Sequence, residues 1–169
     1  LNATDNFAII GGDGATELFS VDSASSPAGL LNGPSLAWTA FTPAVYQGGA
    51  SPLTISNNSK WLRIGKLLHY RIEFSITDAT NAVANQVIFI SHQLPAAHRP
   101  VVVGGGSHGG NGLIYRVGVQ WLHVGVILTD SQSMYLMENR GNNYAGANAT
   151  AFTLANNDVI SLHGFFEVA

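Results

Sequence analysis

The chain has 169 residues, of which 46% are hydrophobic and only 10% are charged, and its formal net charge is −3. It lacks the Lys and Arg clusters that neutralise phosphates and the ~20-residue apolar run that spans a membrane, so we expect neither a nucleic-acid partner nor membrane insertion. The absence of cysteine excludes a disulfide scaffold and a thiolate metal site. With so few charges, the surface must be built from Asn, Ser, Thr and Gly, which suits an extracellular particle and sugar ligands.

The first segment, residues 1–36, differs in texture from the rest of the chain. It contains the glycine-rich turn at 11–14 and a run of small residues at 23–29, and its apolar residues are too few for a core of their own. We predict a short N-terminal β stalk or linker over 1–36 and a head domain over 37–169. A stalk would bury its apolar stripe only when several chains associate, whereas a linker would stay flexible.

From residue 60 onward the apolar residues follow a period of two. Residues 68–76 alternate apolar and polar side chains, as in a strand with one buried face. A short strand at 61–64 and the turn Gly65-Lys66 precede it, which indicates a hairpin. Further strands are expected at 86–91, 101–103, 113–117, 121–129, 134–138, 151–155 and 159–168. No stretch sustains helical spacing, so we predict an all-β fold, an antiparallel β-sandwich of jelly-roll-like form.

The apolar phase changes within this series at Trp121. Val117, Val119 and Trp121 occupy odd positions, whereas the apolar residues from Leu122 to Leu128 occupy even ones. Since a strand keeps one parity on each face, we expect a bulge or a break near Trp121.

Four stretches occur in an order that is found in one known family. They are Trp38 to Pro43 (WTAFTP), Lys60 to Lys66 (KWLRIGK), Phe89 to Ala97 (FISHQLPAA) and Asn157 to Val168 (NDVISLHGFFEV). Together they resemble the C-terminal head domains of phage tail fibres and receptor-binding proteins, and Gly12 to Asp22 is similar to the stalk repeats that precede such heads.

The resemblance implies a homotrimeric β-sandwich head at the tip of a phage tail, outside the cell. Its N-terminal side would contact other tail proteins. The head would bind a polysaccharide or protein of the bacterial surface without cleaving it, so we do not expect an enzyme. The alternative is a carbohydrate-binding module of a secreted bacterial enzyme, which would be a monomer. A glycan depolymerase or serine hydrolase is the third hypothesis.

The glycine-rich stretch 104–112 contains two sequence patterns known from enzymes. G-x-G-x-x-G at Gly104 would need a following helix to hold a pyrophosphate, and G-x-S-x-G around Ser107 would need a strand-turn-helix setting, with Asp130 or Asp158 and His163 completing a triad. The residues that follow are typical of a strand, so neither function is favoured. The carboxylates form no close pair in an apolar setting, as glycoside cleavage would need.

The six histidines show none of the spacings that bind metals, such as H-x-H or H-E-x-x-H. We therefore predict no metal and no cofactor. A symmetric trimer could still gather one histidine from each chain on its axis.

Loops are the expected location of a binding site in an all-β scaffold. Three stand out, at 78–85, 104–112 and 139–148. The third is the main candidate, because Tyr144 offers a flat apolar face to a sugar ring and its neighbours offer hydrogen bonds. The predicted ligand-binding residues are Arg140, Asn142, Asn143, Tyr144, Trp121 and His108. Tyr144 folded against the end of the sandwich, and Trp121 packed in the core, are the structural alternatives.

Overall fold

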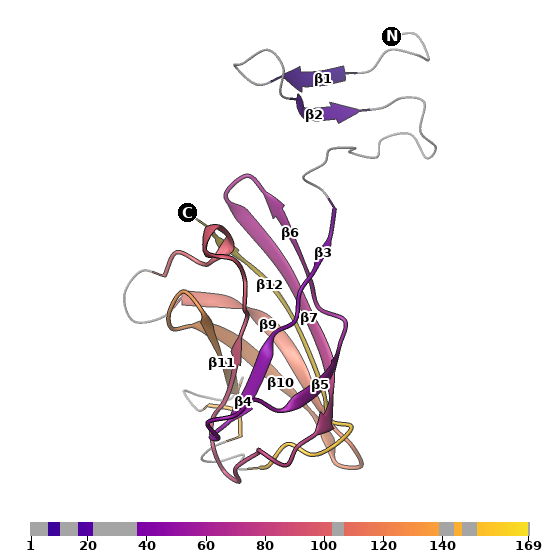
Figure 1. Cartoon of the computed structure of the whole chain (residues 1–169), viewed down its shortest axis with the longest axis vertical. Helices are drawn as coiled ribbons and strands as arrows, with labels where there is room; N and C mark the ends of the chain where they lie inside the picture. Colours follow the sequence, from indigo (N-terminus) through magenta and orange to yellow (C-terminus); the bar gives the residue numbers. More distant parts are fainter. Residues whose placement is uncertain are drawn as a thin grey trace.

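The fold is built almost wholly from strands (Figure 1). The computed structural model describes residues 7–10, 17–21, 37–102, 107–138, 144–146 and 152–168. The strands are β1 Phe7–Ile10, β2 Glu17–Val21, β3 Thr39–Ala40, β4 Ala44–Gln47, β5 Thr54–Asn57, β6 Lys60–Ile64, β7 Leu67–Asp78, β8 Ile88–Ser91, β9 Ser107–Arg116, β10 Gln120–Leu128, β11 Ser133–Glu138 and β12 Val159–Glu167. A 3-10 turn, η2, covers Ala96–His98. In this part of the chain, no helix has the length and apolarity to cross a membrane.

β1 and β2 form a two-stranded antiparallel sheet of their own. The other ten strands form a second sheet. Nine of them follow the order β3-β6-β7-β12-β9-β10-β11-β8-β4, and β5 pairs with the C-terminal half of β7. All of these pairings are antiparallel, which confirms the predicted all-β, antiparallel, sandwich-like fold. The boundary at residue 36 and the stalk remain predictions.

The large sheet curls until its two ends meet (Figure 1). β3 and β4 stand at opposite ends of the strand order, yet only residues 41–43 separate them in the chain. One bent segment therefore pairs with β6 at one end and with β8 at the other. Pro43 lies at the bend, where its missing N–H costs no ladder hydrogen bond. The Leu53 N–H donates to the Val45 carbonyl at 2.8 Å and helps close the seam.

The core lies inside the curled sheet. The alternation predicted for residues 68–76 is confirmed, because the even positions of β7 are buried and the odd ones face outward. They pack with the inward residues of the other strands, among them Ile114, Val124, Val126, Leu136, Ile160 and Leu162. The turn between β6 and β7 contains Gly65 with a φ of +59°, as the hairpin prediction requires.

A break accounts for the phase change at Trp121. Residues 117–119 form the turn between β9 and β10, so the odd-numbered valines belong to the turn and not to a strand. Within β10, Trp121 and His123 face outward and Leu122 and Val124 face inward.

The strand predicted at 151–155 is wrong over its described part, residues 152–155. The backbone there is bound by the buried side chain of Gln47. Its amide nitrogen donates to the Phe152 carbonyl at 2.6 Å, and its amide oxygen accepts from the Leu154 N–H at 2.7 Å. A side-chain amide therefore replaces a neighbouring strand. The strand predicted at 101–103 is also absent from residues 101 and 102. Pro100 forms an isolated β-bridge with Val168, and the Val101 N–H donates a hydrogen bond to the Glu167 carbonyl.

His92 is a fully buried titratable group in this core. Its Nδ1 accepts a hydrogen bond from the Leu94 N–H at 3.1 Å, and its Nε2 has no hydrogen-bond partner among the described residues. Burial lowers the pKa of His92 from 6.5 to about 4. The imidazole is therefore held neutral in the folded chain over a range in which the unfolded chain takes up a proton.

We predict that His92 makes the head less stable toward acid pH. Because the unfolded chain gains the proton first, stability is full above pH 6.5, falls as the pH drops toward 4, and loses roughly 3 kcal/mol in all. In His92→Asn, urea unfolding at pH 7 and pH 4.5 should show a smaller pH dependence. The exposed control His123→Asn should keep the wild-type dependence, and an unchanged dependence in His92→Asn would contradict the assignment.

Candidate functional site

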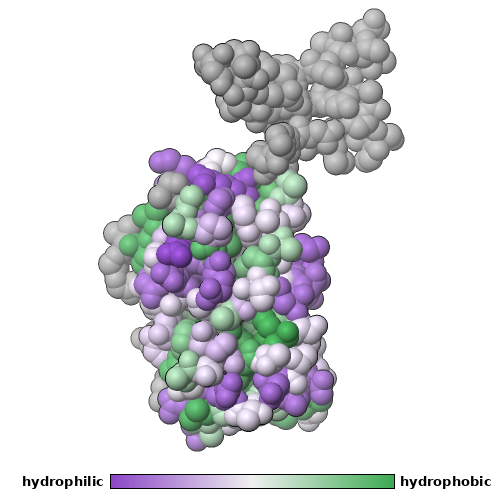
Figure 2. All heavy atoms as spheres, in the orientation of Figure 1, coloured by the Kyte–Doolittle hydropathy of each residue, from purple (hydrophilic) through white to green (hydrophobic). Residues whose placement is uncertain are grey.

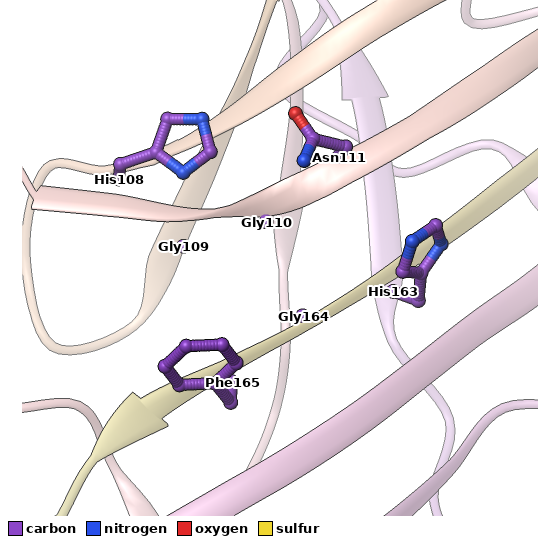
Figure 3. A pocket seen from close by; sticks show the side chains of 7 residues that line it. All are labelled: His108, Gly109, Gly110, Asn111, His163, Gly164 and Phe165. Atoms are coloured by element: carbon purple, nitrogen blue, oxygen red, sulfur yellow. The ribbon is translucent and has the colours of Figure 1, made fainter.

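A pocket of about 190 Å³ opens on the outer face of the large sheet, between β9 and β12 (Figure 3). Seven residues line it: His108, Gly109, Gly110, Asn111, His163, Gly164 and Phe165. Three of them are glycines, which lie between the side chains of the other four. The pocket therefore has a backbone floor and side-chain walls.

The floor exists because β9 and β12 approach each other closely. A Cβ atom on Gly164 would overlap the carbonyl oxygen of Gly109, and one on Gly110 would overlap that of His163. From inside the sheet, the buried Tyr70 hydroxyl donates a hydrogen bond to the Gly109 carbonyl at 3.1 Å. Burial raises the pKa of Tyr70 above its usual value of 10.0, so this hydroxyl keeps its proton.

A β-bulge turns His108 toward the pocket. In β9 the even positions from 112 to 116 face the core side, and an unbroken alternation would send His108 inward as well. The register against β10 shifts at this point, with Val126 opposite Gly110 but Ile127 opposite His108, which leaves Gly109 as the extra residue. This shift reverses the parity and places His108 on the outer face.

The walls come from residues in register across the strands. His163 of β12 lies opposite Asn111 of β9 on one side and Arg71 of β7 on the other. Phe165 lies opposite His69, with ring centroids 5.8 Å apart, and is 59% exposed. The site thus combines an open aromatic face with two imidazoles and an amide. Such a mixture of one apolar surface and a few polar groups is typical of sites for small polar ligands.

Three of the predicted ligand-binding residues, His108, Tyr144 and Trp121, are among the described residues, and of these three only His108 lies in this pocket. Tyr144 is half-buried, with its ring centroid 5.5 Å from that of Tyr135. The Tyr135 ring stacks on Phe89, and Phe89 stacks on Tyr46, so these three rings form a cross-strand aromatic row. Tyr144 packs against the Tyr135 end of this row. Arg140, Asn142 and Asn143 lie outside the described residues.

Trp121 is 60% exposed, so its packing in the core is ruled out. It faces outward from β10 opposite Tyr115 of β9, with ring centroids 4.5 Å apart. Tyr115 and Asn111 point to the same face of β9, so this aromatic pair and the pocket share the outer face of one sheet.

Asn111, His163 and Phe165 are not among the predicted ligand-binding residues, although Asn111 lies in the glycine-rich stretch 104–112 and His163 belongs to the hydrolase pattern. The sequence predicts a loop for the glycine-rich stretch, but its described part is strand from Ser107 onward. Glycines stand in this strand because the close approach of β12 leaves no room for larger side chains. A signal for Phe165 was present. In residues 159–168 the apolar residues at even positions, Phe166 among them, face the core. Phe165 occupies the neighbouring odd position and must therefore face outward.

The hydrolase pattern is not assembled as a nucleophile elbow. Ser107 begins strand β9, with no helix after it in the described residues. Asp158 lies beside the C-terminal end of β9, roughly 30 Å from Ser107, and its carboxylate accepts hydrogen bonds from the N–H groups of Val117 and Ala155. The carboxylate of Asp130, the alternative member of the triad, accepts hydrogen bonds from the N–H groups of Gln132 and Ser133 in its own turn. Likewise, no group of three or more potential metal ligands forms within the described ranges.

No family model, curated protein sequence or solved structure matches this chain. The assignment of the pocket as a candidate site is therefore based on its geometry.

We predict that Gly164→Ala disrupts the pocket and destabilises the head. The added methyl group would collide with the backbone of Gly109 and with Gly110, and the two strands would have to separate. We expect a loss of about 2–4 kcal/mol, the range for overpacking together with a broken buried hydrogen bond, measured by urea unfolding.

Gly125→Ala is the matched control. It lies on β10 opposite Asn111, and its added Cβ would find its nearest neighbour 3.7 Å away, an ordinary contact. Its stability should stay within about 1 kcal/mol of wild type. Equal stability of the two variants would contradict the close backbone contact between Gly164 and the pair Gly109 and Gly110.

Proposed function

We propose that this chain is the receptor-binding head of a phage tail adhesin, which attaches the virion to a glycan of the bacterial surface without cleaving it. The observation that carries the proposal is the exposed Phe165 ring beside two imidazoles and an amide, over a floor of bare backbone. The apolar face of a pyranose stacks on an aromatic ring, while its hydroxyls need donors and acceptors at the edge. The order of the four family-like stretches supports the phage assignment.

The outer face offers a second aromatic contact. From Asn111 to Tyr115 is four positions along β9, or about 13 Å. Trp121 stands beside Tyr115 at that distance. The two aromatic surfaces are thus separated by more than one sugar ring, which suits a polysaccharide chain better than a single sugar. Over the face drawn in Figure 2, hydrophilic and hydrophobic residues are interspersed.

The binding side chains project from paired strands. His163 and Phe165 belong to β12, which is hydrogen-bonded to β7 on one side and β9 on the other. A site built on such elements is held in place before the ligand arrives, so less conformational entropy is lost on binding. This rigidity favours recognition of a repeating surface polymer.

Phe165→Ala should weaken adsorption to host cells by about five- to tenfold, because Phe165 is already half-exposed and stacking regains only part of its burial energy. The measurement is binding of fluorescent chain to a panel of bacterial strains, with and without periodate oxidation of the cell glycans. Val83→Ala, which also truncates an exposed apolar side chain, is the control and should bind like wild type.

Three results would count against the proposal. Unchanged adsorption by Phe165→Ala would remove the pocket from the receptor site. Release of new reducing ends from the cell polysaccharide would support a depolymerase instead. Binding to soluble polysaccharides by a monomer, with no adsorption to any strain, would support the carbohydrate-binding module.

Trp121→Ala should affect long glycans more than short ones. Oligosaccharides prepared from the receptor polysaccharide and long enough to reach both aromatic contacts should lose about fivefold in affinity, whereas a disaccharide held in the pocket should bind as before. Calorimetric titration of a length series makes this comparison. Trp38→Ala, also at a half-exposed tryptophan, is the control. Equal losses at all lengths would contradict a separate contact at Trp121.

A further inference from the structure

Histidines gather on the face that carries the pocket. Of the six in the chain, four project outward from adjacent strands of the large sheet: His69 of β7, His108 of β9, His123 of β10 and His163 of β12. The other two are placed differently, with His92 buried and His98 packed against Trp61 at 4.4 Å between ring centroids. Histidine is the side chain whose charge changes between pH 5 and 8.

Permanent cations extend the same row. Lys60 of β6 lies opposite Arg71 of β7, which lies opposite His163, which in turn lies opposite Asn111. One line of hydrogen-bond donors thus runs across four strands into the pocket. No carboxylate is among the residues that line the pocket.

Two acidic groups share this outer face. Glu73 forms an ion pair with Arg71, and Glu167 stands at the far end of β12 opposite Leu67. At neutral pH these two carboxylates balance Lys60 and Arg71. Beyond these matched charges, the four histidines are the groups on this face that can meet an anion, although the chain as a whole has a formal charge of −3.

We infer that the pocket binds the carboxylate-bearing unit of an acidic polysaccharide, and that the binding strengthens as the pH falls below neutral. The inference rests on the proposed function, and it names the ligand class of the same site. The sugar ring stacks on Phe165, Asn111 takes a hydroxyl, and the carboxylate faces His108 and His163 with Arg71 behind. We propose an acidic and not a neutral glycan because the charges of this face complement those of an anion.

The test compares acidic oligosaccharides with their neutral counterparts. Oligomers of galacturonate and mannuronate, and the same oligomers after chemical reduction of the carboxylates, are titrated calorimetrically into the full chain at pH 5.5 and 7.5. At least one acidic oligomer should bind at pH 5.5 at least about fivefold more tightly than at pH 7.5, and at least about fivefold more tightly than its reduced form. Circular dichroism at pH 5.5 verifies that the chain remains folded despite the acid sensitivity of His92.

Variants assign the effect to the pocket. His163→Gln should lose most of the difference between pH 5.5 and 7.5, and Arg71→Gln should weaken binding of the acidic oligomer at both. His123→Gln, on the same face but outside the pocket, is the matched control and should retain the pH dependence.

Equal affinities for acidic and reduced oligomers, or no binding of either, would overturn the inference. Neither result would decide the proposed function, which the cell-adsorption assay tests separately.

Discussion

The close approach of β9 and β12 is the constraint on which the candidate site depends. Only glycine fits where the two backbones meet, and Gly164 faces Gly109 and Gly110 with no room for a Cβ atom. This contact forms the pocket floor, exposes the Gly109 carbonyl to the Tyr70 hydroxyl below, and accompanies the bulge that brings His108 outward. Core packing and surface recognition therefore meet at the same few backbone atoms.

The strand alternation separates the two tasks of the chain. Inward positions of β7 and β12 supply the core, and the outward positions of the same strands supply Arg71, His163 and Phe165. A substitution on the outer face can change recognition with little effect on the core. The inner face tolerates less, because the curled sheet closes around it.

Closure of the sheet explains why a chain without disulfides can hold a rigid surface. The bent segment that contains β3 and β4 joins both ends of the strand order, and buried Gln47 ties residues 152–154 to it. Because β3 and β4 belong to one continuous segment, the two ends of the strand order are not separate open edges, which limits uncontrolled pairing with other chains.

The sequence by itself determined the all-β class, the hairpin at Gly65, the alternation of β7 and the outward parity of Phe165, because each is a local pattern of two-residue period or turn chemistry. The tertiary structure decided the rest. Which residues lie beside His163 depends on the register between β12 and strands that are some 50 and 90 residues away in the chain, and no local pattern encodes that register. For the same reason the glycines of 109–112 indicate a loop in the sequence but belong to a strand in the structure. Glycine is favoured both in turns and where two backbones approach closely, and only the position of β12 distinguishes these cases.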